Sequence, residues 1–376
     1  MSAAWVISLF TIVVVYFLDQ SKNKALAAVF DWIPAVLLAY VIPALISYFF
    51  SVDYSADAIH GFSKTWVIPM AIVAVMSSLS FAQLKAIGFK PIVLFVIGSA
   101  IIALFPVVFA WGFLDSDLVQ NQWIKANYWK GIPPIVGSWI GGSTSQLVLK
   151  ELAKTSESLF LQVLVIDTVL VNIWTIFMFQ IIKKSHKLNT FFNISDRTIP
   201  IPIAAESQKK LPWYWVLALL ILGVFLVEIF LTIFVVKVIA LSLLGLLVSH
   251  FIPRWNYAFA LRLGGVLIIV VMAILGLKLQ FTALSMSLEF IGFLVLWIFV
   301  HFIGMVLAAK ALNLHLAWVP IASMANVGGI ATAPAVTAAY EKKWMPHAIV
   351  LAILSMATGT FWGMITIFLF QQLFKV

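Results

Sequence analysis

The stretch PPIVGSWIGGSTSQLVLKEL (Pro133–Leu152) is apolar enough to enter a membrane, yet Gly141-Gly142 interrupts it and four polar residues follow directly. It has a counterpart in PIASMANVGGIATAPAVTAAY (Pro320–Tyr340), because adding 187 to the residue numbers places the first glycine pair on Gly328-Gly329. Apolar segments interrupted by Gly or Pro at corresponding positions of two halves are typical of the binding site of a secondary transporter. The pair therefore predicts a chain of two repeats, each with one interrupted segment.

The composition places most of the chain in lipid. Hydrophobic residues make up 64% of the sequence, charged residues 10%, and the mean hydropathy is +1.11. The net charge of +9 comes from lysines in short loops between apolar runs, which favours the positive-inside effect over nucleic-acid binding. The chain has no cysteine, which excludes disulfides, thiolate nucleophiles and Cys-ligated metals. These features predict an all-α polytopic membrane protein.

The apolar runs give the expected domain organisation. We expect uninterrupted helices at 3–18, 33–50, 66–81, 91–113, 159–182, 213–227, 230–251, 259–279, 290–309 and 346–374, the first of them uncleaved. Residues 1–182 then form the first membrane repeat and residues 213–376 the second. Residues 183–212 form a linker, in which Pro200 and Pro202 favour extended backbone.

The number of membrane crossings decides how the halves are related. If both interrupted segments cross fully, there are twelve crossings and the two halves face the same way. If each segment enters and leaves on one side, ten crossings remain, each half has five, and the halves form an inverted repeat. The second arrangement also places more of the 23 Lys and Arg residues on the linker side. It predicts a cytoplasmic linker and external termini for a multi-pass protein of the cell (inner) membrane, although interrupted helices that cross remain an alternative.

The motifs GSWIGGS (Gly137–Ser143) and ANVGGIATAP (Ala325–Pro334) resemble the YjcL-like uncharacterised membrane family, known as domain of unknown function 819, over nearly the whole chain. That family is grouped with the cation:proton antiporter / anion transporter superfamily. The resemblance implies a core domain in which two interrupted helices meet near mid-membrane, a panel domain, a homodimer, and movement of the core past the panel. The chain departs from the family form after the first glycine pair, where Thr144-Ser145-Gln146 stands in place of an expected Asn.

The two breaks predict the substrate site. Glycine pairs let a membrane helix unwind, so that one half-helix offers free N–H groups and a partial positive charge to an anion. A side chain added at Gly142 or Gly329 is expected to fill space shared by backbone and ligand. The alternative is close helix packing at glycine. The expected substrate-binding residues are Gly141, Gly142, Ser143, Thr144, Ser145, Gly328, Gly329, Ile330 and Thr332.

Polar groups inside apolar runs predict a cation site. Asp167 is an ionisable residue within a long apolar run, and such a group in a membrane is a functional-site hypothesis by default. Its alternative is a buried acid paired with Lys150 or Lys154. Asn326 precedes the second glycine pair and is a natural neutral ligand, or a plain interhelical hydrogen-bonding residue. Ser138 and Gln146 complete the expected cation-binding set.

The leading functional hypothesis is a secondary transporter of a small organic anion coupled to Na⁺ or H⁺, rather than an enzyme. We find no P-loop, GxSxG or HExxH motif, and expect no cofactor or metal beyond Na⁺ as a coupling ion. One alternative is a membrane-embedded enzyme that uses Asp167 and His301 as an acid–base pair. The other is a non-transporting membrane scaffold or sensor. The expected partners are a small molecule, the lipid bilayer and a second copy of the chain, and no nucleic acid.

Overall fold

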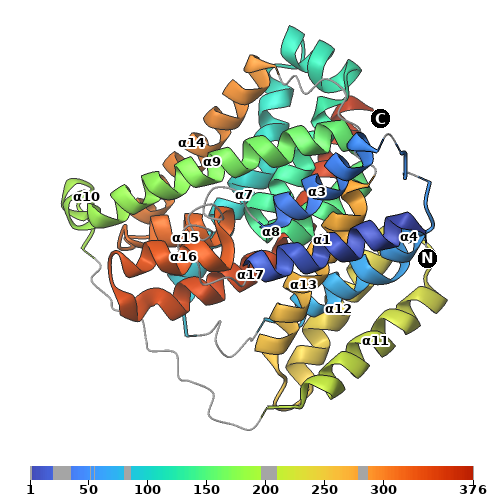
Figure 1. Cartoon of the computed structure of the whole chain (residues 1–376). Coiled ribbons are helices and arrows are strands. Elements are labelled where there is room, and N and C mark those ends of the chain that lie inside the picture. Colours follow the sequence, from blue (N-terminus) through green and yellow to red (C-terminus); the bar gives the residue numbers. More distant parts are fainter. Residues whose placement is uncertain are drawn as a thin grey trace. The chain divides into compact units, whose positions relative to one another are not determined.

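The computed structural model describes residues 2–19, 35–50, 52–54, 56–79, 86–195, 210–277 and 287–375 (Figure 1). Within these ranges the chain is helical and contains no β-strand. It divides into two compact units. The first comprises residues 1–79, 156–168 and 208–285, and the second comprises residues 80–155, 169–207 and 286–376. Each unit therefore combines segments from both halves of the sequence.

The first unit is built from helices that lie early in each half. They are α1 (Ala3–Asp19), α3 (Ala35–Phe49), α4 (Ile59–Phe62), a π-helical turn (Ser63–Val67), α5 (Ile68–Met76), α11 (Trp213–Phe230), α12 (Phe234–Phe251) and α13 (Tyr257–Gly276). The start of α9 (Glu157–Lys183) also belongs here. Helix α13 packs on α1, α3 and α5. Glycines allow these contacts: a Cβ on Gly276 would overlap the backbone of Tyr40, and one on Gly264 would overlap Val75.

The helix expected at 66–81 begins earlier and ends earlier than its hydropathy indicates. It runs from Ile59 to Met76 through α4, the π-helical turn and α5. Asp57 sets the start, because its carboxylate accepts a hydrogen bond of 3.0 Å from the backbone N–H of Ile59. The predicted end at Phe81 lies outside the described residues.

The second unit is built from the later helices of each half. They are α7 (Phe89–Gly112), a π-helical segment (Leu118–Lys125), a 3₁₀ turn (Tyr128–Gly131), α8 (Ile132–Ala153), α10 (Ser185–Phe191), α14 (Leu288–Ala311), α15 (Trp318–Val327), α16 (Gly329–Ala338) and α17 (Met345–Phe374). The remainder of α9 completes the unit. Helix α17 packs along α8 and also contacts α7, α15 and α16.

Aromatic side chains fill part of the interior of the second unit. Trp139 and Trp297 are fully buried with ring centroids 4.6 Å apart, and Trp123 lies 4.7 Å from Phe293. The indole N–H of Trp297 donates to the carbonyl of Ile102 at 3.1 Å, which satisfies the one polar atom of this ring. These contacts hold α14 against α7 and α8.

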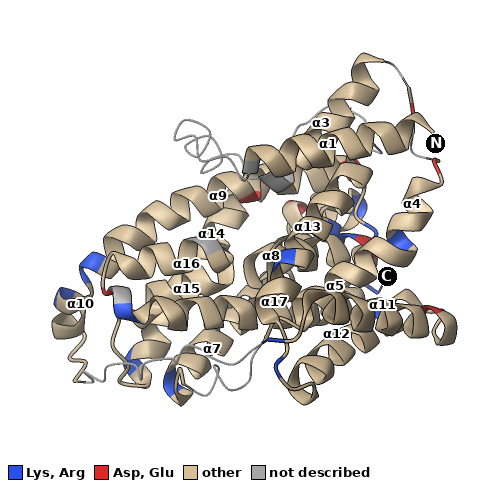
Figure 2. Ribbon diagram, turned by 60° about the horizontal axis from the view of Figure 1, so that its bottom comes forward, with Lys and Arg blue, Asp and Glu red and all other residues tan. Residues whose placement is uncertain are grey.

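The chain has the helices of a multi-pass membrane protein. Among the described residues, seven helical segments are long and apolar enough to cross a membrane, and three shorter apolar helices lie at Ala3–Leu18, Leu38–Phe49 and Val236–Phe251. These ten helices lie where the sequence predicts uninterrupted ones. Figure 2 shows that α15, α16 and α17 carry no charged residue. The prediction of a membrane protein is therefore confirmed.

The segment 183–212 is not extended throughout its described part. Helix α10 occupies Ser185–Phe191, and Asn189 Oδ1 accepts a 2.8 Å hydrogen bond from the backbone N–H of Leu316. This contact ties the start of the expected linker to the second unit, which explains why it folds as a helix. Pro200 and Pro202 lie outside the described residues.

Candidate functional site

The first break lies inside α8. Gly142 has φ +68° and ψ −166°, a non-helical conformation that divides α8 into two helical pieces. This backbone conformation is essentially restricted to glycine. The adjoining Gly141 has a different role, because a Cβ there would overlap the side chain of Ser145. Gly142 therefore interrupts the helical backbone, and Gly141 leaves room for the side chain of Ser145.

The second break repeats this geometry. Helix α15 ends at Val327 and α16 begins at Gly329, whose φ is +69°. A Cβ on the preceding Gly328 would overlap Thr332. Each glycine pair therefore has one residue with positive φ and one that accommodates a hydroxyl side chain four residues later. The two glycines with positive φ are 187 positions apart, the offset that relates the two sequence segments.

The two breaks belong to the same unit, and their helices touch. Helix α8 contacts α15, α16 and α17. A Cβ on Gly359 of α17 would overlap the backbone of Gly141, so the two helices cross at their glycines. Beside this crossing, the hydroxyl of Thr360 donates to Ser145 Oγ at 3.0 Å. Helix α17 therefore supports the first break directly.

The space beside the two positive-φ glycines is open in the structure. A Cβ built on Gly142 or on Gly329 has no heavy atom within 4 Å. A methyl group at either position would thus meet no protein atom, and the expectation that a side chain there fills space shared with a ligand stays a prediction. The glycines are required because L-residues rarely adopt their positive φ.

The substrate-binding set comes together in the second unit. Gly141, Thr144 and Ser145 are buried, whereas Gly142, Ser143, Gly328, Gly329, Ile330 and Thr332 are half-buried. Of the cation-binding set, Asn326 and Gln146 are buried and Ser138 is half-buried in the same unit. Asp167 is buried too, and it belongs to the first unit.

Three polar atoms near the breaks have no hydrogen-bond partner among the described residues. They are Thr144 Oγ1 and Gln146 Nε2 after the first break and Thr332 Oγ1 after the second. Each of these atoms is buried and each can donate a hydrogen bond. A buried donor without an acceptor is unfavourable by about 1–3 kcal/mol. All three lie within four residues after Gly142 or Gly329.

Asn326 is the centre of a buried oxygen-rich cluster. Its Oδ1 lies 3.0 Å from Ser99 Oγ of α7 and 3.1 Å from Ser355 Oγ of α17. Ser99 Oγ also lies 3.1 Å from the carbonyl of Phe95, and Ser355 Oγ contacts the carbonyl of Ile140, two residues before Gly142. The sequence did not point to Ser99 or Ser355. The available signal was a lone serine within each of two long apolar runs.

His301 forms a second chain of hydrogen bonds, and both His301 and Asn326 lie beside Gly98. Its Nδ1 lies 3.2 Å from the Gly98 carbonyl and its Nε2 lies 3.1 Å from Ser323 Oγ. The carbonyl only accepts, so Nδ1 carries the proton and Nε2 accepts from the serine hydroxyl. Ser323 Oγ in turn accepts from the indole N–H of Trp174 at 3.0 Å. The imidazole is neutral in this arrangement, and both ring nitrogens are satisfied.

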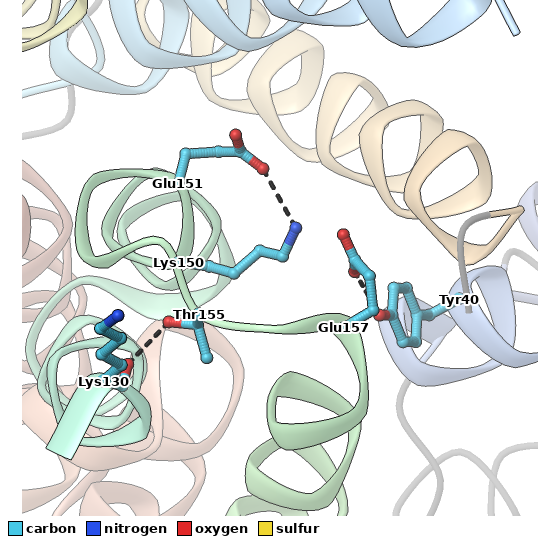
Figure 3. Close-up of polar contacts among 6 residues, drawn as sticks. All are labelled: Tyr40, Lys130, Lys150, Glu151, Thr155 and Glu157. Atoms are coloured by element: carbon cyan, nitrogen blue, oxygen red, sulfur yellow. Dashed lines mark hydrogen bonds and ion pairs between the residues drawn. The ribbon is translucent and has the colours of Figure 1, made fainter. Parts of the chain in front are cut away.

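Two charged residues, Lys150 and Glu151, lie near the C-terminal end of α8. Lys150 Nζ forms an ion pair of 3.0 Å with Glu151, and Thr155 donates to the Lys130 carbonyl at 2.6 Å (Figure 3). In the first unit, the Tyr40 hydroxyl donates to Glu157 at 2.9 Å. Among the described residues, no group of three or more His, Asp or Glu is placed to hold a metal ion.

The sequence was also compared with known proteins. The model of a family described as protein of unknown function (DUF819) matches residues 7–373, which is nearly the whole chain. This match confirms the family resemblance on which the sequence analysis drew. No curated protein matches the sequence.

Proposed function

This chain belongs to the family of proteins of unknown function (DUF819), and from its own geometry we propose that it is a secondary active transporter of a small organic anion. The proposed coupling ion is Na⁺ or H⁺, and the proposed location is the cell (inner) membrane. The substrate binds at the two glycine breaks of the second unit, where access alternates between the two sides of the membrane.

The observation that carries the proposal is the pair of breaks with matching backbone geometry. Gly142 and Gly329 have nearly equal positive φ, and the helices that they interrupt touch within one unit. In a membrane, non-helical backbone is tolerated only where protein buries it or where it lines a cavity. Two such breaks at corresponding positions of a repeat support a shared ligand site between them.

The chemistry beside the breaks favours an anion. The helical pieces that begin after Gly142 and at Gly329 present N–H groups and the positive ends of their dipoles. Thr144 Oγ1, Gln146 Nε2 and Thr332 Oγ1 add unpaired donors. A carboxylate has two acceptor oxygens and can take several of these bonds. The proposed substrate is therefore a small carboxylate.

The division into units supports an inverted repeat with a core and a panel. The first unit takes α1, α3 and α5 from the first half and α11, α12 and α13 from the second. The second unit takes α7, α8 and most of α9, together with α14 through α17. Helices at corresponding positions of the two halves thus belong to the same unit. In the proposal the second unit is the core, the first is the panel, and two copies of the chain form a homodimer.

The alternative of a membrane-embedded enzyme is less well supported. It requires His301 to act as an acid–base partner of Asp167. Both nitrogens of His301 are already used, by the Gly98 carbonyl and by Ser323. A scaffold or sensor would not require unpaired buried donors after both breaks. Transport accounts for these donors.

The test is uptake into proteoliposomes that contain the purified protein. A panel of radiolabelled mono-, di- and tricarboxylates would be offered with an inward Na⁺ gradient, an inward proton gradient or no gradient. We expect gradient-dependent accumulation of at least one carboxylate, and loss of it in the Gly142→Ala variant. Gradient-independent binding without accumulation across the panel would contradict the proposal.

A further inference from the structure

The first interrupted segment, α8, folds back on itself at Gly142. The residues that flank the helix are in contact, because the Thr155 hydroxyl donates to the Lys130 carbonyl at 2.6 Å. Within α8, a Cβ on Gly137 would overlap the backbone of Gln146, although these residues would lie about 14 Å apart along a straight helix. The two pieces of α8 therefore form a helical hairpin with the first break at its tip.

The second interrupted segment, α15 and α16, is a helical hairpin as well. The hydroxyl of Tyr340, after α16, lies 3.2 Å from Nε2 of His315, before α15. The rings of Trp318, at the start of α15, and Trp344 have centroids 5.1 Å apart. In a straight helix, the combined length of α15 and α16 would separate these groups by about 30 Å. The second glycine pair therefore lies at the tip of this hairpin.

Helix α17 of the same unit shows that the two hairpins extend in opposite directions. The base of the second hairpin lies at the N-terminal end of α17, where the Trp318 ring is 6.3 Å from that of His347. The base of the first lies at the C-terminal end, where Trp129 packs on Phe370 and Phe374. Helix α17 has 30 residues and is about 45 Å long. The two tips therefore approach each other along it from opposite ends.

Ser355 of α17 lies between the two tips. Its Oγ contacts the carbonyl of Ile140, just before the first break, and lies 3.1 Å from the side-chain amide of Asn326, just before the second. A carbonyl only accepts, so the Ser355 hydroxyl donates to Ile140 and its oxygen is left to accept. The Asn326 amide donates to that oxygen when its Nδ2 faces it, and its other N–H donates to Ser99 Oγ at 3.0 Å. Each of these donors then has an acceptor.

We propose that Ser355 is a positioning residue that couples the two breaks. Carbonyls in the last turn of a helical piece lack intrahelical donors, and a buried carbonyl needs one. Ser355 supplies this donor to the first hairpin, and Asn326 of the second hairpin holds the Ser355 hydroxyl in place. A displacement of the second tip therefore loosens the first. Under the proposed function, on which this role rests, the two halves of the substrate site rearrange together.

Single cysteines test this coupling, because the chain has no cysteine of its own. The rate at which Ser143→Cys, half-buried directly after the first break, reacts with N-ethylmaleimide reports opening of the first tip. A separate Ala309→Cys protein, with its cysteine buried in α14, reports general loosening of the second unit. Ser355→Ala should raise the ratio of the first rate to the second about fivefold or more, because it leaves a buried carbonyl unpaired. Asn326→Ala should raise it about threefold or more, because the hydroxyl is no longer held in place.

Ser323→Ala is the matched control. Ser323 is a buried serine one turn before Asn326 on α15, but it bonds to His301 and Trp174 and not to Ser355. This variant should leave the ratio of the two rates unchanged even if it lowers stability. The double variant Asn326→Ala/Ser355→Ala should give the same ratio as Ser355→Ala alone, because Asn326 acts on the first tip only through Ser355. Asn326→Leu removes the amide while filling its space, and it replaces Asn326→Ala if that protein is too unstable to purify.

The failure of this coupling and the failure of transport are distinguishable, because the labelling requires no substrate. Equal ratios in the parent protein and in Ser355→Ala would overturn the coupling, as would a double variant in which the two single effects multiply. Gradient-dependent carboxylate uptake by a protein whose ratio does not respond to Ser355→Ala would reject the coupling and keep the transporter. The expected ratios in a protein that accumulates no carboxylate would keep the coupling and reject the transporter.

Discussion

At the scale of single residues, backbone conformation rather than space makes glycine necessary at the breaks. Gly142 and Gly329 have room for a Cβ, yet both have positive φ. Their neighbours show the opposite combination, because Gly141 and Gly328 lack room beside Ser145 and Thr332. Substitution of one glycine of each pair is thus unfavourable because of backbone conformation, and substitution of the other because of lack of space. Measurements on substituted proteins can distinguish these two effects.

Gly142→Ala should destabilise the protein without a steric clash. The expected decrease in the free energy of unfolding is about 1–3 kcal/mol, the strain of a non-glycine residue in this region of φ and ψ. Thermal unfolding in detergent measures it. Gly292→Ala is the control, because Gly292 also has open space around its Cβ position but lies within the regular helix α14. It should be neutral or stabilising by up to about 1 kcal/mol. Equal effects of the two substitutions would contradict the conformational explanation.

Asp167 remains a predicted cation-binding residue. It is buried in the part of α9 that belongs to the first unit. Asp167→Asn should leave insertion intact, because a neutral side chain is less costly in a membrane than a charged one. If Asp167 binds the coupling ion, the variant should lose the Na⁺ dependence of substrate binding, or its pH dependence if the ion is H⁺. Calorimetry at two Na⁺ concentrations and two pH values measures both. Unchanged dependence on Na⁺ and on pH would remove Asp167 from the site.

At the scale of helices, α17 holds the first break in place. At Gly359, the backbone of α17 lies directly against the backbone of Gly141 in α8. Further along both helices, Gly363 of α17 leaves room for the side chain of Leu149 of α8. An added methyl group that overlaps backbone cannot be accommodated by repacking side chains. One that overlaps the end of a leucine side chain can be, because that side chain can move. The two glycines of α17 therefore differ in what can compensate for their loss.

Gly359→Ala should destabilise the second unit by about 1–3 kcal/mol, the usual effect of overpacking. Gly363→Ala should have a similar or smaller effect, and the added change Leu149→Ala should recover part of it by opening space for the new methyl group. Shortening Leu149 should not rescue Gly359→Ala. Midpoints of thermal unfolding for the four variants provide the comparison, and rescue of both glycine variants would show that the Gly141 crossing is not a backbone contact.

The start of the helix at Ile59 should depend on pH. The backbone N–H of Ile59 bonds to Asp57, which lowers the pKa of that carboxyl, with a further contribution from the Ser2 side chain. The folded pKa is thus below the unfolded one of about 3.9. This contribution to stability is complete above the unfolded pKa and is lost as the pH falls through the folded pKa. Asp57→Asn keeps an acceptor that does not titrate, so its unfolding midpoint should fall less steeply than that of the wild type between pH 5 and pH 3. Identical profiles would show that Asp57 contributes nothing to this dependence.

The sequence predicted features that local composition determines and missed those that depend on tertiary contact. Long apolar runs located the helices, and glycine pairs within such runs located the two breaks. The start at Ile59 was missed because the hydrogen bond from the Ile59 N–H to Asp57 forms only in the folded chain. Ser99 and Ser355 were missed because a single serine in an apolar run does not show which residues it will contact in the folded protein. Only the packing of α7, α15 and α17 brings these serines to Asn326.

At the scale of the whole molecule, the division into units follows the order of helices within each half. Early helices of both halves form the first unit, and later helices form the second. A repeat folded in this way gives an inverted arrangement only if each half has an odd number of crossings. Seven described helices meet the length and hydropathy of a crossing, and three shorter apolar helices complete the expected ten. The membrane topology is thus a separate prediction that the division into units does not settle.

We expect ten crossings, with both termini outside and the central linker in the cytoplasm. Five crossings per half place the linker opposite the two termini, and this orientation puts more Lys and Arg on the cytoplasmic side. Reporter fusions before Ala3, after Ser207 and after Val376 measure the sidedness of these three positions. Ser207 lies outside the described residues, but its position in the sequence between the two halves makes it the informative site. With ten crossings the fusion after Ser207 reports the cytoplasm and the other two report the periplasm. With twelve, six crossings per half would put all three fusions on one side. A shared side would therefore rule out the inverted repeat and, with it, the arrangement in which the two breaks approach from opposite faces of the membrane.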